Sequence, residues 1–217
     1  MFYSRFKNRE DAAEKLAREL LEYWDKNPVV LAIPRGGIVI GYEVAQIVNA
    51  PLDLIIPRKI GAPNDSELAI GAVTEDGTTI LNQQLVAELG VSNEYIESEK
   101  SKQIQEIRRR IKVYRGEAAA LSLEGRTIIL VDDGIATGST MKAAIHSIRK
   151  KKPSAIVAAA PVGPPDTVEE LKKEVDKLIC LIIYEPFFAI GQFYDDFDQV
   201  TDEEVIRLLK LSKDAKS

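Results

Sequence analysis

Five short apolar runs, separated by helix-like stretches, constrain the fold of this chain more than any other feature. They are Val29 to Ile33, Leu52 to Ile56, Thr127 to Val131, Ala155 to Ala160 and Leu178 to Ile183. The runs are nearly continuous in apolar character instead of alternating, which is typical of strands buried on both faces of a parallel sheet. They are also far too short to cross a bilayer.

Amphipathic stretches between these runs supply the crossover connections that parallel strands need. A first helix fits Arg9 to Asp25, with Asn8 as its N-cap and Trp24 on its apolar face. Further helices are predicted at Gly37 to Val48, Asn82 to Leu89, Asn93 to Tyr114, Ser139 to Lys150, Asp166 to Asp176 and Asp202 to Leu211. The alternation predicts an α/β fold with an open, doubly wound, mostly parallel five-stranded sheet and flanking helices.

Two segments depart from this alternation. Gly61 to Leu81 starts with loop-forming residues and continues with Leu68 to Val73 and Thr78 to Leu81, which flank an Asp-Gly turn and predict a β-hairpin. After Glu185 the chain becomes aromatic and glycine-containing. The chain has no internal repeat, and we expect one domain over residues 1–217.

The overall charge excludes several classes of partner. The net charge of −5 provides no general positive field for nucleic acid or an anionic membrane, so a phosphate-bearing ligand requires a local positive site. With Cys180 as the only cysteine, no disulfide can form within the chain. The N-terminus lacks the apolar core of a signal peptide, so a cytoplasmic location is expected.

The residues after the third apolar run carry the strongest chemical signal. Thr127 to Thr140 reads TIILVDDGIATGST, in which a strand delivers Asp132 and Asp133 to its carboxyl end before a glycine- and hydroxyl-rich turn opens a helix. Backbone N–H groups at such a helix start form a phosphate site, and Gly138 permits close approach of the backbone. The turn lacks the Gly-Lys-Ser/Thr ending of a Walker A loop. The alternative is a chance turn that only caps the helix.

This segment resembles the phosphoribosyl pyrophosphate (PRPP) motif of the type I phosphoribosyltransferases, in which apolar residues precede two acids and a Thr-Gly-x-Thr turn. The whole chain resembles bacterial and archaeal proteins predicted to be phosphoribosyltransferases. The resemblance implies that the two acids hold the ribose hydroxyls and that the turn wraps the 5-phosphate. The implied PRPP-binding residues are Asp132, Asp133, Gly134, Ala136, Thr137, Gly138, Ser139 and Thr140.

The same resemblance implies Mg²⁺ as the cofactor, bound mostly by sugar, pyrophosphate and water oxygens. Asp132 and Asp133 would then be indirect or water-mediated ligands. Replacing both aspartates by asparagine is expected to weaken sugar binding and to leave the fold intact.

A second candidate anion site follows the first apolar run. Ala32 to Gly37 reads AIPRGG, where Arg35 supplies charge and the glycines leave N–H groups unobstructed at a strand-to-helix turn. The resemblance makes Pro34, Arg35, Gly36 and Gly37 the pyrophosphate loop, and it implies a non-proline cis peptide at the bond into Arg35. An ordinary tight turn with a surface arginine is the alternative.

Two adjacent cations, Arg58 and Lys59, end the second apolar run at the sheet edge where ligands collect in open α/β folds. The resembling enzymes have a mobile flap after this strand, so residues 58–81 are the implied flap. Arg35, Lys59 and Arg58 are the candidate catalytic residues, which would stabilise the departing pyrophosphate. A solvated basic pair is the alternative for Arg58 and Lys59.

The acceptor is the part of the reaction that the sequence defines least. The family covers its acceptor with a variable hood, here residues 1–8 and 186–217, with candidate pieces Phe2 to Phe6 and Phe187 to Tyr194. The hood's aromatic side chains either stack on a planar base or form the hood's own core. Where 6-oxopurine members carry an aspartate this chain has Ala136, which counts against hypoxanthine, guanine and xanthine.

Three classes of function follow from these residues. The first is an enzyme that transfers phosphoribosyl from PRPP to a small nitrogenous acceptor; the second is a PRPP-sensing regulator without turnover; the third is a hydrolase or phosphorylase. Arg35, Arg58 and Lys59 favour catalysis, because a sensor need not stabilise departing pyrophosphate. Neither nucleic acid nor a membrane is an expected partner. Dimerisation is common in the resembling family, which implies a homodimer.

Other residues receive structural interpretations. Ile104, Ile107 and Ile111 form a narrow apolar seam on a highly charged helix, which predicts a packing or subunit contact more than a ligand site. His146 is interpreted as non-catalytic and Cys180 as a small core residue.

Overall fold

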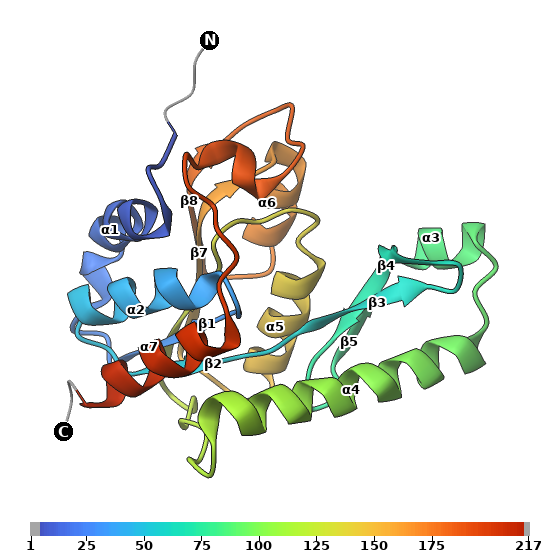
Figure 1. Ribbon diagram of the computed structural model, residues 1–217, viewed down its shortest axis with the longest axis horizontal. Helices are drawn as coiled ribbons and strands as arrows, with labels where there is room; N and C mark the ends of the chain where they lie inside the picture. Colours follow the sequence, from blue (N-terminus) through green and yellow to red (C-terminus); the bar gives the residue numbers. More distant parts are fainter. Residues whose placement is uncertain (1–4, 215–217) are drawn as a thin grey trace.

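The computed structural model describes residues 5–214 and has the expected α/β architecture, with a five-stranded parallel sheet (Figure 1). The strand order is β2-β1-β6-β7-β8. The bounds are β1 Pro28–Ala32, β2 Leu52–Leu54, β6 Thr127–Val131, β7 Ala155–Gly163 and β8 Lys177–Ile183. All five predicted strands are therefore present.

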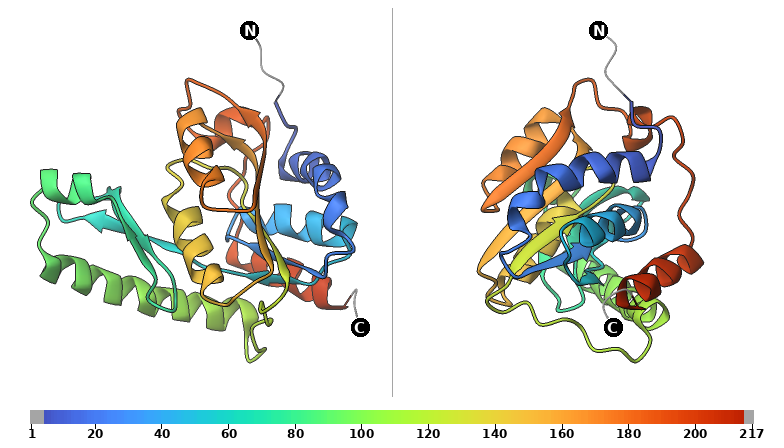
Figure 2. Two further views of the ribbon diagram at one scale, coloured as in Figure 1. Left: turned by 180° about the vertical axis from the view of Figure 1, so that it is seen from behind. Right: turned by 90° about the vertical axis from the view of Figure 1, so that its left-hand side faces the viewer.

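Helices cover both faces of this sheet, with α1 and α2 on one face and α5 and α6 on the other (Figures 1 and 2). The α-helices are α1 Arg9–Glu19, α2 Gly37–Ile47, α3 Gln83–Glu88, α4 Asn93–Arg115, α5 Ser139–Arg149, α6 Pro165–Lys172 and α7 Asp202–Asp214. Short 3-10 turns are η1 Leu21–Tyr23 and η2 Ile190–Phe193. No helix within the described range has both the length and the apolar character needed to cross a membrane.

The continuous apolar runs are explained by burial from both sides. All five residues of β1 are buried; Val30 and Ala32 pack with the cluster beneath α1 and α2, whereas Val29 and Leu31 pack with the cluster beneath α5 and α6. A strand covered on both faces has no solvent side that would need polar residues.

The first helix starts as predicted and ends earlier. The Asn8 side chain accepts a hydrogen bond from the Asp11 N–H and caps α1. The helix stops at Glu19, and the following 3-10 turn leaves the Trp24 side chain 65% exposed. The prediction that Trp24 shares the buried face is therefore wrong.

The segment expected to form a hairpin is a three-stranded antiparallel sheet, with β3 Arg58–Ala62, β4 Asp65–Val73 and β5 Thr79–Leu81. The predicted pairing of β4 with β5 is confirmed, whereas two details are wrong. Arg58 and Lys59 begin β3 instead of ending β2, and Gly61 lies in β3 instead of a loop. A Cβ at Gly61 would lie 2.7 Å from the Ser66 carbonyl oxygen, so close strand approach explains this glycine.

This small sheet, α3 and the first turns of α4 form an arm that extends to one side of the main sheet (Figures 1 and 2). Ile60 and Ile70 from the arm and Ile107 from α4 are fully buried and belong to the same apolar cluster as α1 and α2. The seam predicted on α4 is thus a packing contact within the chain.

Candidate functional site

Two glycine-containing loops meet at the carboxyl edge of the main sheet. β1 and β6 are adjacent and parallel, with Ala32 opposite Val131, so the loops that follow them lie side by side. A Cβ on Gly37 would lie 3.0 Å from the Cα of Asp132, and one on Gly36 would lie 1.8 Å from Asp133 Oδ2. These distances explain why both positions hold glycine: the first loop packs directly against the two acids of the second.

Neither loop ends in a side chain that caps its helix. Gly138, with φ of +71°, occupies the N-cap of α5, and Gly36 occupies the N-cap of α2; neither can offer a side-chain acceptor to the first-turn N–H groups. By contrast, Asn8 caps α1 and Ser92 caps α4. Uncapped helix starts at a sheet's carboxyl edge have the donors and the partial positive charge that a phosphate requires.

The predicted PRPP turn divides into a buried part and an accessible part. Gly134 is buried, and a Cβ there would lie 2.6 Å from Ile190 Cγ2 and 2.8 Å from Val162 Cγ2. Ala136 and Thr137 are exposed, and Ser139 and Thr140 are partly exposed. The accessible part of the turn is therefore residues 136–140, apart from the buried Gly138, and Gly134 is small because it packs beneath η2.

The two acids of the motif have different surroundings. Asp133 is buried, and its Oδ2 accepts a hydrogen bond of 2.8 Å from Arg9 Nε, an ion pair in which the side chains are 10% and 11% exposed. Its backbone carbonyl accepts a 2.7 Å bond from the hydroxyl of Tyr194. Because Asp133 joins α1 to the turn, we now expect its replacement to cost stability. The expectation of an intact fold is kept for replacement of Asp132.

Asp132 is the acid with more access to solvent, although its environment is crowded. Its Oδ1 accepts a 2.9 Å bond from the Asp133 N–H. Burial raises the pKa of Asp132 well above its usual range, and the negative charge of Asp133 raises it further. A cation or hydroxyl donor from a ligand would stabilise the charged form of this carboxylate.

The donor set suits a magnesium ion that arrives with a phosphorylated ligand. Among residues 5–214 no three His, Cys, Asp or Glu side chains are grouped so that they could hold a metal ion. Asp132 is a partly exposed carboxylate between the two glycine-containing loops, and Mg²⁺ is commonly bound by one or two carboxylates together with substrate phosphates.

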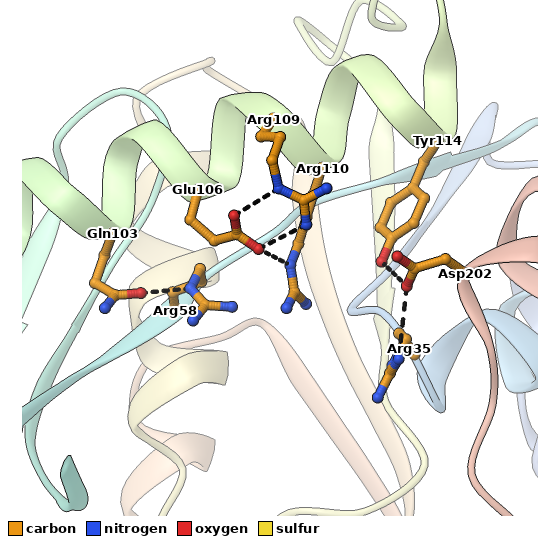
Figure 3. Close-up of polar contacts among 8 residues, drawn as sticks. All are labelled: Arg35, Arg58, Gln103, Glu106, Arg109, Arg110, Tyr114 and Asp202. Carbon is orange, nitrogen blue, oxygen red and sulfur yellow. Dashed lines mark hydrogen bonds and ion pairs between the residues drawn. The ribbon is translucent and has the colours of Figure 1, made fainter.

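Arg35 of the first loop forms an ion pair with α7, and α4 bonds to the same carboxylate (Figure 3). The Pro34–Arg35 peptide is cis, as the family resemblance implied. An Arg35 terminal nitrogen lies 3.6 Å from Asp202 Oδ1 of α7, and the Tyr114 hydroxyl of α4 donates to that same oxygen at 2.7 Å. Burial and the hydrogen bond to Asp202 raise the pKa of Tyr114 to about 12, so the phenol stays a neutral donor near pH 7.

Arg58 and Lys59 line a cavity of about 710 Å³ together with both loops and α4. Arg58 is half-buried and donates from Nε to Gln103 Oε1 of α4, whereas Lys59 is exposed. Burial lowers the pKa of Arg58, and the positive charge of Arg110 lowers it further. The lining residues from the predicted site are Pro34, Arg58, Lys59 and Thr140, and those from α4 are Tyr95, Glu99, Gln103 and Arg110.

The sequence interpretation missed two contributors to this region. The α4 side chains were assigned to packing only, because Arg110 lies within a run of charges in which no periodicity distinguishes the cavity side. Arg9 was missed because its partner is 124 residues away. A signal for Arg9 existed, since it shares the helical face of Ala13, Leu16 and Leu20, all of them buried, and a charge on an apolar face requires a partner.

The terminal pieces of the predicted hood pair with each other. Phe6 forms a parallel bridge with Tyr194, and its N–H donates to the Phe193 carbonyl at 2.9 Å. Phe193 is fully buried against Phe187 and Tyr184 and so belongs to the hood's own core, whereas Phe188 is 84% exposed. Residues 1–4 of the predicted hood lie outside the described residues.

Neither His146 nor Cys180 lines the cavity of Arg58 and Lys59. His146 Nε2 is 3.1 Å from Glu174 Oε2. Burial raises the pKa of the Cys180 thiol to about 12, which suits an unreactive side chain.

Fold and site together define an α/β protein with two glycine-containing loops packed against each other at one sheet edge. Comparison with known proteins identifies the family. The phosphoribosyl transferase domain family matches residues 3–198. Proteins from two strains of Mycobacterium tuberculosis, provisionally named phosphoribosyl transferases, are 40% identical over 204 residues. The match covers 94% of this chain and 46% of theirs, so the chain spans about half the length of these curated relatives.

A solved structure, that of the protein TT1426 from Thermus thermophilus, is 38% identical, with a TM-score of 0.80 over 94% of this chain and 97% of that chain. The chain therefore belongs to the phosphoribosyl transferase domain family, which confirms the resemblance seen in its sequence.

Proposed function

We propose that this protein transfers the 5-phosphoribosyl group of PRPP to a nitrogenous base and releases pyrophosphate. One observation carries the proposal: two uncapped glycine loops pack against each other at the carboxyl edge, with Asp132 between them. Two anion sites at such short spacing match a ligand that carries a phosphate on one end and a pyrophosphate on the other. We further propose that residues 1–217 act as one domain, with residues 58–81 as the flap.

In this reaction the bond between ribose C1 and the pyrophosphate oxygen breaks while a base nitrogen attacks C1. Negative charge grows on the leaving pyrophosphate, and we assign its stabilisation to Arg35, Arg58, Lys59 and the amides of residues 35–37. Residues 136–140 would hold the remote 5-phosphate, whose binding free energy orients C1 for attack. Asp132 would accept hydrogen bonds from the ribose hydroxyls.

Bound Mg²⁺ would neutralise part of the pyrophosphate charge, and we assign Asp132 as its protein carboxylate partner. The ion pair with Arg9 leaves Asp133 a supporting role, because one of its oxygens already accepts a charged hydrogen bond. Closure of the flap would exclude water, which otherwise hydrolyses the sugar donor.

A pyrophosphate-release screen tests the proposal. Purified protein is incubated with PRPP, Mg²⁺ and a panel of bases that includes adenine, uracil, hypoxanthine and guanine. Release that depends on one base supports transfer and identifies the acceptor; Ala136 favours an acceptor other than a 6-oxopurine. Tight PRPP binding without release for any base would contradict transfer and support the sensor. Release without any base would indicate a hydrolase.

A further inference from the structure

Beyond the two sequence motifs, helix α4 contributes four side chains to the lining of the 710 Å³ cavity, Tyr95, Glu99, Gln103 and Arg110. Glu106 of α4 accepts hydrogen bonds from two consecutive arginines, Arg109 and Arg110 (Figure 3). Only Arg110 lines the cavity that also contains Arg58, Lys59 and Thr140. Its side chain is 26% exposed, whereas that of Arg109 is 56% exposed.

Arg110 is oriented by Glu106 through a single nitrogen. The contact is from Arg110 Nε to Glu106 Oε1 at 2.8 Å, so the two terminal nitrogens with their four N–H groups have no protein partner within residues 5–214. Arg58 is held in the same manner, through Nε to Gln103. The close-up shows the guanidinium ends of Arg58 and Arg110 on the same side of α4 (Figure 3).

Two guanidinium groups in one cavity repel each other. Burial lowers the pKa of Arg58 and the positive charge of Arg110 lowers it further, whereas the negative charges of Glu106 and Glu99 act in the opposite direction. An anion with several oxygens would relieve that repulsion and accept charge-assisted hydrogen bonds from both forks. The alternative is that Arg110 only forms a surface ion pair with Glu106, four residues earlier on the same helix. Such exposed pairs contribute little to stability. Arg109 represents that alternative on the same helix, because it shares the carboxylate and lies outside the cavity.

We propose that Arg110 of α4 binds the pyrophosphate of the substrate together with Arg58. The inference rests on the proposed function, since it takes PRPP as the ligand. It adds to the two sequence motifs a third element, the long helix, whose residues contact the leaving group.

Isothermal titration calorimetry with three ligands tests this assignment: magnesium pyrophosphate, PRPP with Mg²⁺, and ribose 5-phosphate. Arg110→Gln should weaken pyrophosphate and PRPP binding by about tenfold or more, as expected for lost hydrogen bonds to a charged group. Ribose 5-phosphate binding should not change, because this ligand has no pyrophosphate. Arg110→Lys should restore part of the affinity, because it keeps the charge and loses the fork.

The matched control is Arg109→Gln, which should keep wild-type affinity for all three ligands. Unchanged pyrophosphate affinity in Arg110→Gln, or equal weakening in Arg109→Gln, would overturn the inference and leave the proposed function standing. If the wild-type protein binds neither PRPP nor pyrophosphate, the proposed function and the inference both fail. Thermal melts followed by circular dichroism identify any variant that has lost its fold. If a glutamine variant is unfolded, the pyrophosphate affinities of Arg110→Lys and Arg109→Lys are compared instead, and only Arg110→Lys should bind pyrophosphate more weakly than the wild type.

Discussion

Replacing Arg9 by methionine tests the buried ion pair that joins α1 to Asp133, at the start of the turn after β6. The paired atoms of Arg9 and Asp133 are 2.8 Å apart, with side chains 10% and 11% exposed. Removing one partner of such a pair leaves an uncompensated charge and costs about 3–5 kcal/mol of unfolding free energy. Arg9 also donates to the Asp198 carbonyl at 2.7 Å, and its guanidinium carbon lies 3.8 Å from the ring centroid of Phe197. Because these two contacts are lost as well, we expect the loss of unfolding free energy in Arg9→Met to lie in the upper half of that range.

The control is Arg5→Met, which removes two exposed contacts of the same segment, the ion pair with Asp195 and a 2.9 Å hydrogen bond from Arg5 Nε to the Gln192 carbonyl. Arg5 lies 3.5 Å from Asp195, with side chains 48% and 61% exposed, and the loss of such a pair costs less than about 1 kcal/mol. Adding Asp133→Asn to Arg9→Met removes both charges. The loss of unfolding free energy in this double variant should therefore be about 1–3 kcal/mol smaller than the sum of the losses in the two single variants.

Unfolding by urea is followed by far-UV circular dichroism, because the only tryptophan, Trp24, is 65% exposed and reports poorly on the core. A loss in Arg9→Met no larger than that in Arg5→Met, or single-variant losses that add without coupling, would refute the reasoning.

Three further predictions concern the same site. In Gly36→Ala the new carbon would lie 1.8 Å from Asp133 Oδ2, so the loop must shift, and PRPP affinity measured by calorimetry should fall by about tenfold to a hundredfold. In the control Gly125→Ala no atom lies within 4 Å, so PRPP affinity should not change, although the φ of +68° strains the new side chain and should lower stability. Asp132→Asn should weaken PRPP binding and keep the melting temperature within a few degrees of wild type; a collapse in melting temperature would contradict its assignment as the ligand-facing acid. Hydrogen bonds from Arg109 and Arg110 lower the pKa of Glu106 from 4.5 to about 2, so the pair's contribution is present above pH 4.5 and is lost as the pH falls towards 2. Since these groups are partly exposed, Glu106→Gln should cost less than about 1 kcal/mol at pH 7, and the urea midpoints of variant and wild type should converge near pH 2.

The parallel sheet and the two loops could be predicted because their signals are local. Val29 to Ile33 and Thr127 to Val131 are unbroken apolar runs, and each leads into a glycine-containing turn. Parallel strands bring their carboxyl ends to one edge of a sheet, so the sequence predicted both loops at that edge. That the loops lie side by side follows from the pairing of β1 with β6, which the structure supplies. The cis peptide before Arg35 followed from the family resemblance and not from any physical signal in the residues.

The parts that sequence could not supply depend on contacts between distant residues. β3 begins with Arg58-Lys59 and contains Gly61, so it lacks the apolar pattern of a strand and is formed by pairing with β4. Arg110 differs from Arg109 only by the helical rotation between consecutive residues, and the cavity exists only once α4 has packed beside β3. The division of labour between Asp132 and Asp133 depends on Arg9, far away in the chain.

The central claim is that residues 136–140 hold the 5-phosphate of PRPP while the loop of Pro34 to Gly37 faces its pyrophosphate. A crystal structure of the protein with PRPP and Mg²⁺ tests this most directly. The account predicts density for the 5-phosphate against the N-terminal amides of α5 and the sugar hydroxyls beside Asp132. A 5-phosphate bound at any other place, or no PRPP density at millimolar concentration, would contradict it.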